Sequence, residues 1–174
     1  MAREALQGPV KRAFWPGFQT PEHIMPYCRL LLASLTLYLA VFLAPLRGET
    51  PIFFSGGDAA INGYDTVAYF TKGKPVKGKA DIAVMWKGVM WQFASKGNRA
   101  RFEANPRAYA PQYGGYCAYG VANGYRDRSE PDAWQISNGK LYMIRSHYVR
   151  AIWNRDVRGY IARADSNWPG VLDD

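Results

Sequence analysis

Hydrophobic and polar residues alternate in two separate stretches of the chain, and each stretch predicts a β-hairpin followed by a short helix. In the first, residues 83–85 and 89–93 are rich in aromatic and β-branched side chains and flank Lys87-Gly88. Ser95 stands where a helix N-cap belongs. Asn105-Pro106 predicts the end of that helix, because the residue before a proline disfavours the α region.

The same order recurs 51 residues later, so residues 84–109 and 135–160 are predicted to be copies of one unit. In the second copy, Asn138-Gly139 is a strong hairpin turn and Ser146 is the N-cap. An alternative is that unrelated hairpin-helix units share caps, turns and core faces. Nine class-matched pairs favour duplication: Gly88 with Gly139, Met90 with Leu141, Trp91 with Tyr142, Phe93 with Ile144, Ser95 with Ser146, Ala100 with Ala151, Phe102 with Trp153, Arg107 with Arg158 and Tyr109 with Tyr160.

These patterns predict an α+β fold in which Phe102 and Trp153 pack each short helix onto its hairpin. Residues 61–70, INGYDTVAYF, predict a turn feeding a short strand, and residues 71–79 form a loop by their Gly and Pro content. The predicted organisation is a leader at 1–48, an irregular lead-in at 49–60, the domain at 61–168 and a tail at 169–174.

The apolar stretch 30–44 follows Arg29 and has the character of a secretory signal. It is short for a bilayer crossing, which needs about 20 apolar residues. Export to the periplasm is therefore predicted. The small-x-small cleavage pattern is poorly formed, so retention as an N-terminal membrane anchor is the alternative. A start at Met25 would leave a leader of ordinary form.

Charge and composition restrict the functional classes. The chain of 174 residues is 48% hydrophobic and 15% aromatic, which is ample for a core. Residues 49–174 carry 17 Lys and Arg against 12 Asp and Glu, a net charge of +5. Because the basic residues are scattered among acids, they indicate a solvated surface and no nucleic-acid partner.

Cysteine and histidine are the scarce chemical groups. The cysteines are Cys28, inside the leader, and Cys117. His23 lies upstream of the leader's apolar stretch 30–44, which leaves Cys117 with His147 as the candidate dyad. Cys117 is a buried small residue, a metal ligand or a redox thiol. Asp65 is interpreted as a turn or cap residue, and a catalytic carboxylate is the less favoured alternative. The chain has no phosphate loop, HExxH or GxSxG motif.

Four segments carry a family resemblance: GYDTVAYF from Gly63, WQFASKGNRARFEANPRAYAPQYGGYCAYGV from Trp91, DAWQISNGKLY from Asp132 and ADSNWP from Ala164. On these segments, residues from about 61 to 168 resemble the exported bacterial group of YHS-domain proteins. The resemblance implies soft-metal or copper handling by cysteines. At the corresponding positions this chain has Ala68, Ala94 and Asn98, so the first copy is predicted to be structural.

In the second copy, Cys117 precedes the hairpin and His147 follows the N-cap, near the donor positions that the resemblance implies. We therefore predict copper or another soft metal at Cys117 and His147, with Met143, Tyr116 or Tyr142 as assisting groups. The predicted function is an exported, non-enzymatic binding module. The alternatives are a structural or protein-interaction domain without metal, and a thiol-dependent redox protein.

Overall fold

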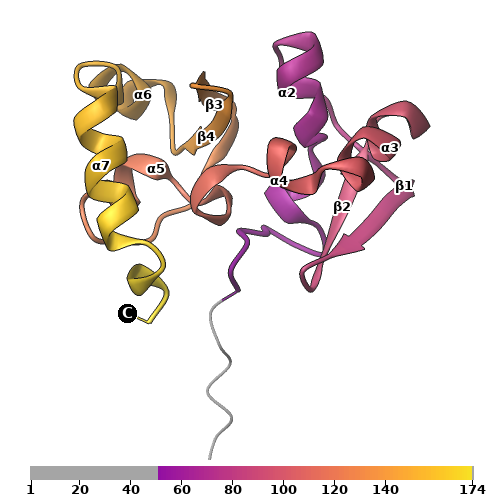
Figure 1. Ribbon diagram of the computed structural model, residues 1–174, viewed down its shortest axis with the longest axis horizontal. Helices are drawn as coiled ribbons and strands as arrows, with labels where there is room; N and C mark the ends of the chain where they lie inside the picture. Colours follow the sequence, from indigo (N-terminus) through magenta and orange to yellow (C-terminus); the bar gives the residue numbers. More distant parts are fainter. Residues whose placement is uncertain (1–50, 174) are drawn as a thin grey trace, which may run out of the picture. The chain divides into compact units, whose positions relative to one another are not determined.

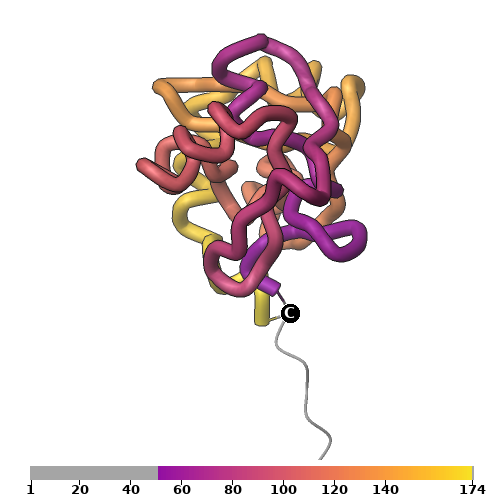
Figure 2. Tube along the Cα trace, turned by 90° about the vertical axis from the view of Figure 1, so that its right-hand side faces the viewer, coloured from indigo at the N-terminus to yellow at the C-terminus, as the bar shows by residue number. Residues whose placement is uncertain are grey.

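The structure is a computed structural model that describes residues 51–173 (Figure 1). Gly48–Asp174 forms one compact unit. The predictions for the leader, for the apolar stretch 30–44 and for the start at Met25 lie outside the described residues. Within the described residues, no helix combines the length and apolar character that a membrane crossing requires. The first described residues and the C-terminal end lie on the same side of this unit in both views (Figures 1 and 2).

The described chain consists of two consecutive repeats of the same elements, which we call the first and the second repeat. The first repeat contains η1 (Ala60–Gly63), α2 (Thr66–Lys72), β1 (Lys79–Trp86), β2 (Val89–Phe93), α3 (Lys96–Ala104) and α4 (Pro106–Tyr109). The second contains η2 (Gln112–Gly115), α5 (Ala118–Ala122), β3 (Glu130–Ser137), β4 (Lys140–Ile144), α6 (His147–Trp153), α7 (Val157–Asn167) and η3 (Gly170–Leu172). The α+β class and the two hairpin-plus-helix units are confirmed.

The repeats agree in backbone irregularities that sequence patterns do not reveal. Each antiparallel hairpin has a register shift at the same place, between Lys79 and Ala83 in β1 and between Glu130 and Trp134 in β3. Each N-cap serine accepts a hydrogen bond from the backbone three residues on, Ser95 from Asn98 and Ser146 from Val149. Shared irregularities of this kind favour duplication of a common unit over a generic likeness.

The equivalence also extends upstream of the hairpins, at an offset of 52 residues. Residues 61–63 have φ values of 51°, 54° and 73°, and residues 113–115 have values of 52°, 61° and 83°. Three consecutive left-handed residues are rare. A glycine is needed at position 114, because a Cβ there would lie 1.7 Å from the Ile52 carbonyl oxygen. The matched turns make Asp65 and Cys117 equivalent, each as the N-cap residue of the helix that follows.

One predicted element is wrong. The segment after Asp65 was expected to form a strand, yet Thr66–Lys72 is the helix α2. The Asp65 carboxylate caps this helix by accepting hydrogen bonds from the backbone N–H groups of Val67 and Ala68. The cap satisfies two N–H groups that a helix start leaves unpaired, and this stabilises a helix in a segment whose β-branched and aromatic residues favour a strand.

Two hydrophobic clusters form the core, and strand β4 contributes to both. Leu141 and Met143 lie in the cluster of the first repeat, while Tyr142 and Ile144 lie in the cluster of the second. Successive side chains of a strand point to opposite faces, so the β3–β4 hairpin is a wall shared by the two repeats. Its outer face is covered by the first repeat, where Tyr69 meets Trp134 edge-on with ring centroids 5.1 Å apart.

Candidate functional site

The start of the first helix in each repeat is a cluster of inward-pointing backbone N–H groups. In the first repeat these groups surround Asp65, which is completely buried. One carboxylate oxygen accepts from Val67 N at 2.9 Å and Ala68 N at 3.2 Å. The other accepts from Ala94 N at 2.8 Å and Asn98 Nδ2 at 2.7 Å. Asp65 therefore joins the start of α2 to the start of α3, and its interpretation as a cap is confirmed.

In the second repeat the thiol of Cys117 lies at the same place. The backbone N–H groups of Tyr119, Gly120 and Arg145 are near enough to lower the pKa of the thiol, although the sulfur makes no cap hydrogen bond to the helix start. These three N–H groups are the equivalents, in the same order, of the three backbone donors to Asp65. The fourth partner has no counterpart, because Val149 stands where the first repeat has Asn98. We call these two sites the Asp65 nest and the Cys117 nest.

The electrostatic environment keeps the Cys117 thiol protonated. Burial is the largest influence and raises the pKa of the thiol above its ordinary value, and the charge of Asp127 acts in the same direction. The three neighbouring backbone N–H groups lower the pKa without offsetting the burial. Reactive cysteines have lowered pKa values and are partly exposed, whereas only 1% of Cys117 is exposed. The surroundings are those of a structural thiol.

Residues 123–129 cover the Cys117 nest. The Cys117 N–H donates to the Asp127 carbonyl at 3.0 Å, and the Asp127 carboxylate forms an ion pair with Arg145. A Cβ added to Gly120 would approach the ring and the carbonyl oxygen of Tyr125 to 3.1 Å, so this backbone packs closely against the helix start. A ligand reaching the thiol from solvent would have to displace this segment.

His147 occupies a different environment. It is the first residue of α6, its side chain is 61% exposed, and its Nε2 lies 3.0 Å from an oxygen of Asp132. Cys117 and His147 thus have different partners, and Met143 packs into the cluster of the first repeat. Within residues 51–173, no three or more His, Cys, Asp or Glu side chains are grouped to hold a metal ion. The metal pair remains a prediction.

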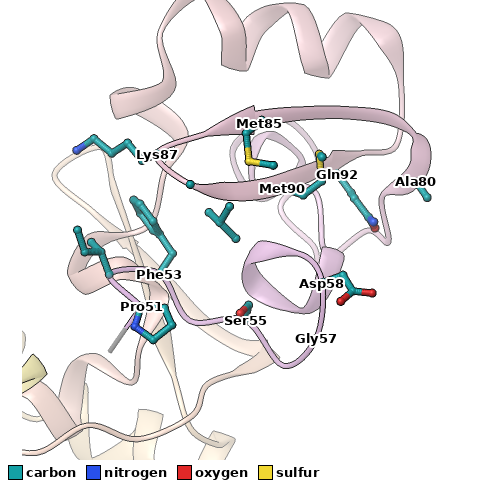
Figure 3. Close-up of a pocket in the computed structure, with 13 residues that line it drawn as sticks. Pro51, Phe53, Ser55, Gly57, Asp58, Ala80, Met85, Lys87, Met90 and Gln92 are labelled. Carbon is teal, nitrogen blue, oxygen red and sulfur yellow. The ribbon is translucent and has the colours of Figure 1, made fainter. Parts of the chain in front are cut away.

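An open groove beside the β1–β2 hairpin is a feature that sequence reasoning missed. It has a volume of about 720 Å³ and lies between the lead-in and the outer face of the hairpin (Figure 3). Met85 and Met90 are directly opposite each other in the strand register and both line it. Ile52 is 55% exposed and Met85 is 59% exposed, and both belong to the groove. The alternation of β1 places Met85 on the outer face, a signal available in the sequence.

A family model described as YHS domain matches residues 67–113. The matched stretch begins in α2 and ends at Tyr113, so it covers most of the first repeat and stops before the Cys117 nest. No curated protein and no solved structure matches the chain. The match therefore does not extend into the helices and hairpin of the second repeat.

The equivalence of the two repeats also refines the place of the donors. In the second repeat, the counterparts of Ala68, Ala94 and Asn98 are Gly120, Arg145 and Val149. The donor positions implied by the resemblance are therefore without cysteine in both repeats. Cys117 takes the place of Asp65 instead, about one helical turn before the first donor position, and His147 takes the place of Lys96. The Cys117 nest contains one soft donor, the Cys117 sulfur, whereas a closed structural zinc site has four ligands.

The Asp65 nest generates a stability prediction. In Asp65→Asn the amide oxygen can still accept from Val67 and Ala68, but the NH₂ group would face the N–H of Ala94 and the amide of Asn98. We expect the free energy of unfolding to fall by about 2–3 kcal/mol, because buried donors lose their acceptor. Urea denaturation measures the change. Asp81→Asn, on exposed β1 surface, is the control and should stay within about 0.5 kcal/mol. Equal stability of the two variants would contradict the assignment.

Proposed function

Because the chain contains a YHS domain, we propose that it is a non-enzymatic binding module and that the groove beside β1–β2 takes up another protein surface. The observation that carries this proposal is the pair of large apolar side chains, Ile52 and Met85, exposed in one groove. Exposed apolar surface that is concentrated in one concave place is typical of interaction sites. The burial of Cys117, which raises its pKa, supports a structural role for the thiol.

The composition of the groove suits a protein surface better than a small polar ligand. Val89 and the two methionines supply apolar contact area, and methionine side chains adapt to partners of different shape. Asp58 and Lys87 lie on its border and provide charges for orientation. A core of apolar contacts with charges at the rim is the usual arrangement in protein interfaces.

We further propose that the module acts outside the cytoplasm, in the periplasm or tethered to the membrane face. The support is the apolar stretch 30–44 after Arg29, which has secretory character. The single cysteine of residues 49–174 agrees with this location, because it leaves no second thiol in that part of the chain for an unwanted intramolecular disulfide.

Site-specific photo-crosslinking tests the groove. A photoreactive phenylalanine analogue replaces Met85 in cells that express the full chain, and the same analogue at Tyr148 is the control, since Tyr148 is 77% exposed outside the groove. We expect a protein adduct of defined mass from position 85 and little from position 148, measured by blotting and mass spectrometry. Absence of an adduct at 85, or equal adducts at both positions, would refute the proposal.

Soft-metal binding at Cys117 is the second candidate function. Two findings favour it: the YHS match, whose family is associated with copper, and the three N–H groups that would stabilise a metal-bound thiolate. A metal at this site would be held by the Cys117 sulfur under the covering segment. His147 serves as a second donor only if it leaves Asp132.

Cu(I) titration against a competing chelator tests this candidate. A raised thiol pKa means that the metal must displace a proton, so the affinity should increase about tenfold per pH unit through the neutral range. Binding should be lost in Cys117→Ser. Loss of binding in His147→Ala as well would support the predicted pair, whereas unchanged binding would restrict the site to Cys117. Absence of stoichiometric binding in the native protein at pH 8 would eliminate the candidate.

A further inference from the structure

We infer that the partner in the groove is a second copy of this chain, bound about a two-fold axis through the outer faces of the two β1–β2 hairpins. This inference rests on the proposed function, and it adds the identity of the partner. The face consists of Ala83, Met85, Met90 and Gln92, two residues from each strand.

The second repeat shows what such a face requires. At the offset of 51 residues, the four positions become Trp134, Ile136, Leu141 and Met143. Leu141 and Met143 are completely buried against the first repeat. Tyr69 stacks edge-on against Trp134 there, and its hydroxyl donates to the Pro131 carbonyl at 2.9 Å. The hairpin is therefore a two-faced element, and its outer face is covered wherever a preceding repeat is present.

The first hairpin lacks that cover within the described residues. A segment of the lead-in borders its β2 edge through a parallel bridge between Ala59 and Met90, and the groove remains over the rest of the face. Met85 is exposed to 59%, although its equivalent Ile136 is partly buried against the cluster of the first repeat. A repeat stack normally covers its ends with polar faces, and this end is apolar.

The opposite end of the repeat pair is closed, which excludes head-to-tail extension. Helix α4 of the first repeat has 4 residues, whereas its equivalent α7 continues for 11 residues and packs along α5. The ring of Tyr160 in α7 lies 5.1 Å from that of Tyr119 in α5. With one open end and one closed end, identical copies can share the open face only by meeting face to face, which gives a closed two-fold dimer.

Charges on the border of the groove fit the two-fold arrangement. Lys87 is in the hairpin turn and Asp58 precedes η1, and Figure 3 shows them on opposite sides of the groove. A two-fold axis through the face reverses one groove against the other, so Lys87 of each copy approaches Asp58 of its partner. Surface pairs add little affinity, but they select this orientation over others.

The size of the face sets the expected affinity. A stable dimer buries roughly 800 Å² per partner, and one two-stranded hairpin with its lead-in offers less. We therefore expect a concentration-dependent dimer with a Kd on the order of 10–100 µM, without which the folded unit remains intact. The folded unit has its own two hydrophobic clusters and does not depend on dimerisation for its core.

Sedimentation velocity over a concentration series tests the inference, with both the full chain and the compact unit Gly48–Asp174. Met85→Glu should raise the Kd at least about tenfold, because a charge would be buried in the apolar face. Tyr148→Glu is the matched control and should leave the Kd unchanged. Thermal unfolding of each variant verifies that the fold is kept.

A charge exchange tests the orientation. Lys87→Glu and Asp58→Lys should each weaken the dimer about threefold or more, and the double variant should restore it, because the pair is then re-formed with reversed sign. Monomers at every concentration would overturn the inference. A dimer that forms with Gly48–Asp174 but not with the full chain would also overturn it, because the N-terminal segment would then fill the groove. A crosslink from position 85 to a different protein would overturn it and leave the proposed function standing.

Discussion

The backbone N–H groups at the start of the first helix in each repeat must find an acceptor inside the protein, and the fold of both repeats depends on this constraint. Asp65 supplies a carboxylate that accepts four hydrogen bonds, and the Cys117 sulfur lies near the three equivalent backbone N–H groups of the second repeat. In both repeats the acceptor links the first helix to the residue that follows the hairpin. The nest thereby fixes the distance between helix and hairpin, and the hydrophobic clusters form around that geometry.

This constraint changes the meaning of the cysteine. Considered alone, one thiol in a domain that the sequence predicts to be exported suggests metal or redox chemistry. Considered as the counterpart of Asp65, it is a buried group beside the same backbone N–H groups, and burial keeps its pKa raised. The functional surface that we propose lies elsewhere, on the hairpin face that is buried in the second repeat and open in the first. The two repeats therefore have similar hairpins, and they differ mainly in the segments that cover the outer face of each hairpin.

Sequence patterns were sufficient for the hairpins, because Asn138-Gly139 and the alternating strands are local signals. The N-cap serines Ser95 and Ser146 were predicted for the same reason. The helix α2 was missed, since its stability depends on a buried carboxylate whose partners Ala94 and Asn98 come from about 30 residues further along the chain. The equivalence of Asp65 and Cys117 was also hidden, because the offset changes from 52 to 51 between the turn and the hairpin. The groove depends on what packs against a face, which no local pattern reports.

The central claim is that Cys117 completes the same nest as Asp65, and amide hydrogen exchange on the native protein tests it most directly. The claim predicts strong protection of the amides of Tyr119, Gly120 and Arg145, comparable with those of Val67, Ala68 and Ala94. In Cys117→Ala, protection should fall by about tenfold or more at the first three amides and remain unchanged at the other three. Rapid exchange at Gly120 and Arg145 in the native protein, or protection that survives the loss of the sulfur, would contradict the account.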